Sequence, residues 1–251
     1  MVKLEKVSDL VLKRNEFCHR SVAAIKDLLE RPKPYNLSTL RIINCKIAAQ
    51  HTRDLIKLIR ETNHLKVLGL VNCRIDDNSM SELGMVLQES TRMQELDISW
   101  NVLKLQSYLN LIVGLGANKT LVSLNLSWNT IFEEIETIIK PEEKQFGETA
   151  AGFELSHRSR RSARPKEWHE EEVEFTPFST QAIENVCALL KRNKRLQHVN
   201  LSQTGLTEYM IIKLGKAMRR AKALCSIHLD GNRGVTKRVK DHLHGLIRCM
   251  P

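Results

Sequence analysis

One spaced apolar pattern recurs along this chain and restricts its architecture more than any other feature. The pattern reads apolar, two residues, apolar, one residue, apolar, two residues, Asn or Cys, one residue, apolar. The copies that begin at Leu65, Met93 and Leu121 are the clearest, and each starts 28 residues after the one before. The same interval of 28 residues separates Leu196 from Leu224. A fixed period of this length predicts a solenoid, in which each unit is stable only when it is stacked on its neighbours.

Four further copies complete a series of seven. The second copy begins at Leu37, 28 residues before Leu65, and keeps the pattern. The first copy, which begins at Val7, is degenerate; the sixth has Thr204 in place of Asn, and the seventh has one extra residue before Val235. These departures fall towards the two ends of the chain, where atypical capping units are expected.

Repeats of this kind resemble the leucine-rich repeat of the ribonuclease-inhibitor type, in which each unit is a short strand followed by a full helix. The resemblance covers nearly the whole chain. It implies an α/β leucine-rich-repeat solenoid, a curved horseshoe arc of about seven repeats with a parallel β-sheet on the concave face and helices on the convex face. It also implies that the concave face is the binding surface.

The residues of each unit explain why the pattern favours a strand, a turn and a helix. Alternate residues of the Leu-x-Leu segment are buried, as in a strand, and the Asn or Cys can hydrogen-bond backbone groups that the turn leaves unpaired. In the third unit Ser79 and Glu82 have the spacing of a capping box, which predicts an N-cap at Ser79. Met80, Leu83 and Leu87 then follow at helical intervals.

Bulk composition agrees with one continuous intracellular solenoid. Apolar residues make up 42% of the 251 residues, and no apolar run approaches the roughly 20 residues that cross a bilayer. The start of the chain lacks the basic segment and apolar block of a signal peptide. Cys45 and Cys73 occupy turn positions and Cys187 lies on an apolar helix stripe, so we expect buried free thiols in a reducing compartment. We therefore expect a cytoplasmic protein that meets no membrane.

One long segment interrupts the repeats. Leu196 follows Leu121 by 75 residues, which is 47 more than one unit. We expect a degenerate N-terminal capping repeat over 1–36, repeats over 37–132, a charged and largely disordered insertion over 133–178, and repeats with a C-terminal capping helix over 179–251. The insertion is either a tolerated surface loop or a segment that orders on a partner. Its candidate anchors in the second case are Phe146, Phe153, Trp168, Phe175 and Phe178.

Positive charge is concentrated in the last quarter of the chain. The whole chain carries +10, and residues 191–251 alone carry +11 from fourteen Lys and Arg and three Asp and Glu. A charge run is usually a solvated face, but a patch of this size also favours acidic partners such as nucleic acid, acidic protein tails or the acidic stretches of the insertion. The patch comprises Lys191, Arg192, Lys194, Arg195, Arg219, Arg220, Lys222, Lys237 and Arg238.

The concave face offers the best candidate for a partner-binding site. The residue directly before the turn position is Trp in two successive units, Trp100 and Trp128, which should lie on adjacent strands about 5 Å apart. Two neighbouring tryptophans with an acidic and hydroxyl surround are typical of a protein-binding hot spot. Alternatively, the indoles pack on each other or under the insertion and seal the edge. The expected partner-binding residues are Trp100, Trp128, Glu95, Asp97, Asn125, Ser127, His198 and His228.

No motif indicates catalysis, a metal or a cofactor. His198, His228 and Asp230 fall on two adjacent strands, but a metal site needs more converging ligands, so a hydrogen-bonded polar patch is the interpretation we favour. The chain lacks a Gly-rich phosphate loop, a zinc-type Cys pair and a nucleophile motif. We therefore expect that this protein is not an enzyme, unless a partner supplies the catalytic groups.

These observations favour a non-catalytic scaffold or adaptor that binds a protein partner through the concave face and the inserted loop. A basic scaffold suits an acidic structure, so a cytoskeletal or ciliary (axonemal) assembly with tubulin-like acidic surfaces is the setting that we expect. The rival hypothesis is a protein that binds RNA or DNA through the C-terminal Lys- and Arg-rich turns. That hypothesis is less favoured because no reading module or stacking platform accompanies the charge.

Overall fold

The computed structural model describes residues 7–31, 37–132 and 177–248. The expected insertion over 133–178 lies outside these residues except for its last two, and so do the five aromatic anchors apart from Phe178. None of the helices in the described ranges is long and apolar enough to cross a membrane.

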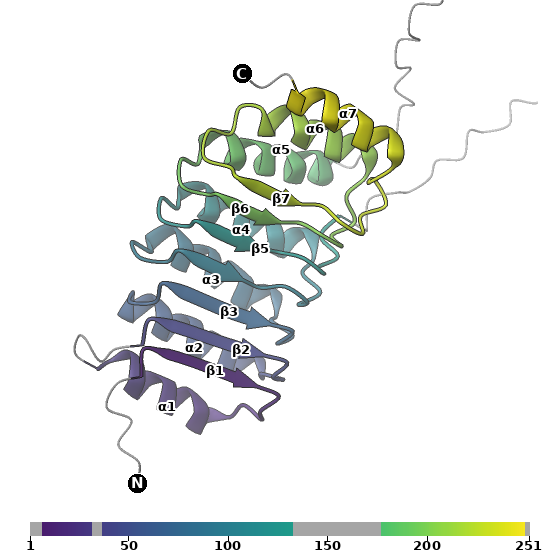
Figure 1. Ribbon diagram of the computed structural model, residues 1–251. Coiled ribbons are helices and arrows are strands. Elements are labelled where there is room, and N and C mark those ends of the chain that lie inside the picture. Colours follow the sequence, from purple (N-terminus) through teal and green to yellow (C-terminus); the bar gives the residue numbers. More distant parts are fainter. Residues whose placement is uncertain (1–6, 32–36, 133–176, 249–251) are drawn as a thin grey trace, which may run out of the picture.

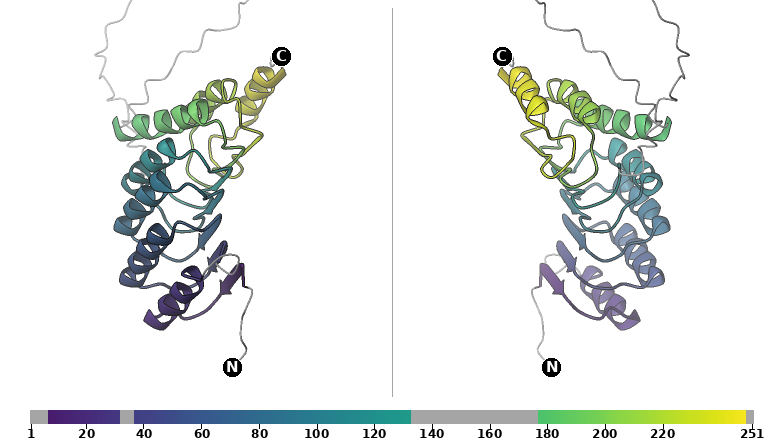
Figure 2. Two further views of the ribbon diagram at one scale, coloured as in Figure 1. Left: turned by 90° about the vertical axis from the view of Figure 1, so that its left-hand side faces the viewer. Right: turned by 90° about the vertical axis from the view of Figure 1, so that its right-hand side faces the viewer.

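Within the described residues, seven strands form one parallel sheet in sequential order, and a helix follows each strand. The strands are β1 (Asp9–Lys13), β2 (Thr39–Ile43), β3 (Val67–Val71), β4 (Glu95–Asp97), β5 (Ser123–Asn125), β6 (His198–Asn200) and β7 (Ser226–His228). The helices are α1 (His19–Leu29), α2 (Ala49–Thr62), α3 (Asp77–Glu89), α4 (Leu105–Ala117), α5 (Pro177–Arg192), α6 (Glu208–Met218) and α7 (Lys237–Arg248). All helices lie on one side of the sheet, which confirms the α/β leucine-rich-repeat-like solenoid (Figure 2).

The register of the sheet repeats the period of the sequence. Leu68 of β3 pairs with Leu96 of β4, and Leu96 pairs in turn with Leu124 of β5. Leu124 then pairs with Val199 of β6, although the long segment separates these two residues in the chain. The sheet therefore continues from β5 to β6 without a break, and β6 occupies the place that the next repeat requires.

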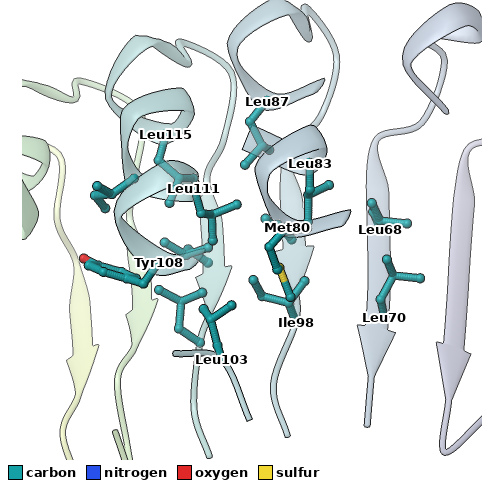
Figure 3. Close-up of a cluster of buried hydrophobic side chains, with 14 of the residues drawn as sticks. Leu68, Leu70, Met80, Leu83, Leu87, Ile98, Leu103, Tyr108, Leu111 and Leu115 are labelled. Carbon is teal, nitrogen blue, oxygen red and sulfur yellow. The ribbon is translucent and has the colours of Figure 1, made fainter. Parts of the chain in front are cut away.

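The core is a continuous apolar layer between the sheet and the helices. Leu68 and Leu96 of the strands and Leu83 and Leu111 of the helices are all fully buried. Figure 3 shows the side chains of α3 and α4 directed towards the strands. Because burial of such a side chain stabilises by about 1.5–3 kcal/mol, stacking of successive repeats supplies most of the stability.

The turn asparagines bind the repeats to one another. Asn129 is fully buried, and its Oδ1 accepts hydrogen bonds from the backbone N–H groups of Asn101 at 3.0 Å and Leu103 at 2.9 Å. Its Nδ2 donates to the carbonyl oxygens of Ile98 at 3.1 Å and Leu126 at 2.9 Å. One side chain thus satisfies backbone groups of its own repeat and of the preceding one, which confirms the role expected of the turn residue.

The N-cap of helix α3 lies three residues before the capping residue that the sequence indicated. Its N-cap is Asp76, whose carboxylate accepts from the backbone N–H of Ser79 at 2.9 Å and from the Ser79 hydroxyl at 2.9 Å. The prediction of an N-cap at Ser79 was wrong, because the Asp76 carboxylate accepts from the free N–H group of Ser79 and so caps the first turn itself. Ser79 is the third residue of the helix.

Helices α3 and α4 approach each other backbone to backbone. A Cβ added at Gly114 of α4 would lie 1.9 Å from the carbonyl oxygen of Gly84 in α3. A Cβ added at Gly84 would lie 2.8 Å from the carbonyl oxygen of Asn110 in α4. The pair of glycines therefore sets the spacing of these two helices, and no side chain fits between them at this point.

Candidate functional site

A column of left-handed residues marks the edge where the strands end. In each repeat the residue directly before the turn position has a positive φ, between 51° and 70°. This conformation costs a residue with a Cβ about 1–2 kcal/mol, and Asn and Gly tolerate it best. The column consists of Arg14, Asn44, Asn72, Trp100, Trp128, Gln203 and Gly231.

Two of these residues, Trp100 and Trp128, form what we call the tryptophan rim. Their ring centroids are 4.1 Å apart and the ring planes differ by 11°, so the indoles are stacked. Even so, Trp100 is 47% exposed and Trp128 45% exposed. The indoles pack on each other and still present a large apolar surface, in a backbone conformation that favours Asn or Gly.

The backbone under the tryptophan rim is held by the next repeat. The N–H of Trp100 donates to the carbonyl oxygen of Ser127 at 3.1 Å, and the N–H of Trp128 donates to that of Ser202 at 2.9 Å. Each indole therefore projects from a backbone that two adjacent repeats fix. A rigid aromatic pair of this kind loses little conformational entropy when it binds a partner.

The polar residues expected beside the tryptophans are engaged with one another. Asp97 accepts from the Ser99 hydroxyl at 2.7 Å and from Asn125 Nδ2 at 3.1 Å. Asn125 Oδ1 accepts from the hydroxyl of Ser127 at 2.8 Å, and Ser127 itself is buried. These side chains brace the strand ends, so the indoles are the groups that project at this edge.

Glu95 is also engaged, at the other end of β4. Its Oε1 accepts from the guanidinium of Arg41 at 2.7 Å, and both side chains are about one third exposed. The pair links strands β2 and β4 across the face of β3, where Gly69 supplies no side chain: a Cβ there would lie 3.2 Å from Cγ of Arg41. Glu95 therefore belongs to an ion pair that joins two strands on the concave face of the sheet.

The two histidines expected at the C-terminal strands lie on neighbouring strands but not opposite each other. His198 of β6 pairs with Ser226 of β7, and its Nδ1 lies 2.8 Å from the Ser226 hydroxyl. His228 is exposed and stands opposite Asn200. Among the residues that the structure describes, no three His, Cys, Asp or Glu side chains gather as ligands of a metal ion.

The expected basic patch divides into separate groups. Lys194, Arg195 and Lys222 lie on the turns that lead into β6 and β7, and Lys237 and Arg238 begin α7. The other four, together with two lysines of α6 that sequence analysis did not single out, line one hollow of the helix layer, which we call the basic groove. Its six cations are Lys191, Arg192, Lys213, Lys216, Arg219 and Arg220.

Among the cysteines that the structure describes, Cys18 should react first with an alkylating agent. At the start of α1, hydrogen bonds from the Ser21 backbone and hydroxyl lower the pKa of the Cys18 thiol, so more of it is the nucleophilic thiolate at a given pH. Burial raises the pKa of Cys73 to about 12 and also raises that of Cys187. With iodoacetamide at about pH 7.5, peptide mass spectrometry should show Cys18 modified several-fold faster than the exposed Cys225.

The Ser21→Ala variant is the control for this prediction, because it removes the hydroxyl that contacts Cys18 at 3.8 Å. Its Cys18 should react more slowly than in the parent chain. Equal modification rates at Cys18 and Cys225, unchanged by Ser21→Ala, would contradict the assignment.

Comparison with known proteins supports the fold. No protein-family model matches the chain, and no curated protein matches it. Among solved structures, the chain is similar to the tropomodulin C-terminal domain of Caenorhabditis elegans, with a TM-score of 0.52 and 15% identity over 80% of this chain and 92% of that one. The actin-binding site 2 of leiomodin-1 matches with a TM-score of 0.44 and 12% identity, over 69% of this chain and 73% of that one. At 15% identity the likeness to the tropomodulin domain concerns the fold alone.

Proposed function

We propose that this chain is a non-catalytic protein-binding module whose contact surface centres on the tryptophan rim. The observation that carries the proposal is the stacked, half-exposed pair of Trp100 and Trp128 on a left-handed backbone. Trp is among the residues that contribute most to protein–protein binding, because it buries a large area with few rotatable bonds. The two preceding repeats have Asn44 and Asn72 at this position, which tolerate the left-handed backbone better than Trp. A role in partner contact accounts for tryptophans that carry this conformational cost.

The polar residues beside the rim have a supporting role in this proposal. Asp97, Asn125 and Ser127 hold the ends of β4 and β5 in place beneath the indoles. A preorganised surface binds more tightly than a mobile one, since less entropy is lost on association. Glu95 and the two exposed histidines lie farther along the concave sheet, where they would form the polar margin of a larger contact.

The narrower setting that we propose is a scaffold of the ribonuclease-inhibitor type in an intracellular cytoskeletal assembly, with a ciliary axoneme as one case. Its 28-residue strand–helix units support the type. A net charge of +10 supports a partner with an acidic surface, such as a filament that bears tubulin-like acidic tails. The exposed turn cations Lys194, Arg195 and Lys222 are those that would meet such a surface.

Replacement of both indoles should abolish partner binding without harming the fold. The variant Trp100→Asn/Trp128→Asn copies Asn44 and Asn72, whose side chains hydrogen-bond each other at 2.9 Å in the same column. We expect the free energy of unfolding to change by less than about 1 kcal/mol, because relief of the left-handed strain offsets the lost stacking. Affinity isolation from cells should lose a defined protein partner, and binding to that purified partner should weaken at least about a hundredfold.

Arg14→Asn is the matched control, because it makes the same kind of change in the same column at the far end of the sheet. It should leave binding unchanged. Cosedimentation with microtubules and with actin filaments then tests the cytoskeletal setting. Retention of every partner by the double variant would contradict the proposal. Recovery of nucleic acid alone, lost on nuclease treatment, would favour the basic turns and the rival hypothesis.

A further inference from the structure

The basic groove is lined by residues of helices α5, α6 and α7 on the helix layer, whereas the tryptophan rim lies at the ends of strands β4 and β5. These three helices are neighbours at the C-terminal end of the helix layer (Figures 1 and 2). The groove has a volume of about 840 Å³, and Cys187 and Ala188 of α5 contribute to its lining. Of the described residues that line it, six are Lys or Arg and Glu184 is the one carboxylate.

An earlier repeat of the same chain shows how unusual this arrangement is. Between α2 and α3, Arg60 Nε and Nη2 donate to the Glu89 carboxylate at 2.8 and 2.5 Å. Counted back from the first apolar residue of the following repeat, Lys191 stands at the position of Arg60, and Arg220 stands at that of Glu89. An ion pair between adjacent helices is thus replaced by two cations. The crevice beside Arg60 and Glu89 measures only about 10 Å³.

Internal charges offset only part of the positive charge in the groove. Glu184 is already bound to Lys213, at 3.1 Å between Oε1 and Nζ. The C-terminal ends of α5 and α6 each contribute a partial charge of about −0.5, which together offsets about one cation. With Glu184 included, about four of the six positive charges remain, and they repel one another across one hollow. A bound multivalent anion would offset that repulsion.

The size and chemistry of the groove select the kind of anion. A phosphate group carries about −1.5 to −2, so two or three of them match the remaining charge, whereas a peptide needs about four carboxylates to do so. Arg192, Arg219 and Arg220 supply guanidinium groups that bind phosphate oxygens in pairs. The volume lies within the roughly 300–1,000 Å³ of small-molecule sites. No Trp, Tyr or Phe is among the described lining residues, so stacking of nucleobases is not favoured.

We propose that the basic groove binds a compact anion that carries two or more phosphate groups. The anion is either free in solution or the headgroup of a phosphorylated lipid, since both present the same clustered phosphates. The site lies on the helix layer, whereas the rim lies at the strand ends, so the two sites can be occupied together. This inference does not depend on the function proposed for the tryptophan rim.

Calorimetric titration of the full chain tests the proposal, with inositol hexakisphosphate as the probe for free phosphates. Vesicles that contain phosphatidylinositol bisphosphate test the lipid source, beside vesicles that carry phosphatidylserine alone. The decisive variant is Arg220→Glu, which recreates the Arg60–Glu89 arrangement with Lys191 as its partner. We expect binding of the probe to weaken by at least about tenfold, with the melting temperature of the free protein kept or raised.

Arg92→Glu and Lys46→Glu are the matched controls, because each makes the same change of charge at an exposed position on a loop of an earlier repeat, away from helices α5, α6 and α7. Both should bind the probe like the parent chain. Equal weakening in controls and variant would overturn the proposal by showing a general charge effect. A poly-glutamate peptide or a DNA duplex that binds as tightly as the probe at the same salt concentration would also overturn it. Probe binding that raises the melting temperature of the parent chain but not of Arg220→Glu would support it.

Discussion

Asn129→Ala should destabilise the solenoid more than any other single truncation considered for this chain. The buried side chain hydrogen-bonds two backbone N–H groups and two carbonyl oxygens. Alanine would remove all four of these hydrogen bonds from the interior. Since each buried polar group left unsatisfied costs about 1–3 kcal/mol, a loss of about 4 kcal/mol in the free energy of unfolding is expected. Urea denaturation followed by circular dichroism measures it, with the m-value unchanged if unfolding stays two-state.

The chain contains its own controls for this prediction. Asn15 stands at the same position of the degenerate first repeat, but it is exposed and its Nδ2 donates to the Lys13 carbonyl oxygen. Asn15→Ala should therefore cost less than about 1 kcal/mol. Asn129→Cys should fall between the two alanine variants, because Cys73 makes contacts of this kind with the carbonyl oxygens of Ile42 and Val71 at 3.3 and 3.4 Å. Similar losses at Asn15 and Asn129 would refute the account.

Two glycines of helix α4 should respond to alanine with opposite signs. At Gly114 the new methyl group would overlap the Gly84 carbonyl oxygen, so α3 and α4 must separate and lose packing. We expect the free energy of unfolding to fall by about 3 kcal/mol or more, although alanine favours the helix itself. Thermal and urea denaturation of the variant provide the measurement.

Gly116→Ala is the matched control, two residues further along the same helix. A Cβ at Gly116 meets nothing within 4 Å, and the residue is exposed. This variant should gain about 0.5 kcal/mol, since alanine restricts the unfolded chain and favours the helix. Destabilisation of the same size at both positions would mean that helix conformation, and not the contact between α3 and α4, governs the result.

The fold could be predicted from the sequence in detail because each repeat carries the same local signals. Alternation of buried and exposed residues places Leu68 and Leu96 in the core, and the constant interval places them opposite each other in the sheet. The start of α3 could not be placed correctly, since Asp76 and Ser79 both have the chemistry of a cap and only the backbone conformation decides between them.

The candidate site was only partly accessible to sequence analysis. The repeat register indicated that Trp100 and Trp128 lie on adjacent strands, but the stacking and the exposed fraction depend on side-chain rotamers and on the left-handed backbone. The predicted basic patch did not include Lys213 and Lys216, because helical spacing alone does not tell which cations face a neighbouring helix. Comparison of Arg60 with Lys191 across repeats was the signal in the sequence that could have indicated the groove.

The sequence by itself determined the repeating unit, the order of the strands and the residues of the core. These depend on contacts within one repeat and between adjacent repeats, which a constant interval encodes along the chain. Only the tertiary structure decided the volume and lining of the basic groove, the exposure of the tryptophan rim and the close approach of Gly84 and Gly114. Those features depend on how whole helices and strand ends pack in three dimensions, and small differences in packing separate a closed crevice from an open site.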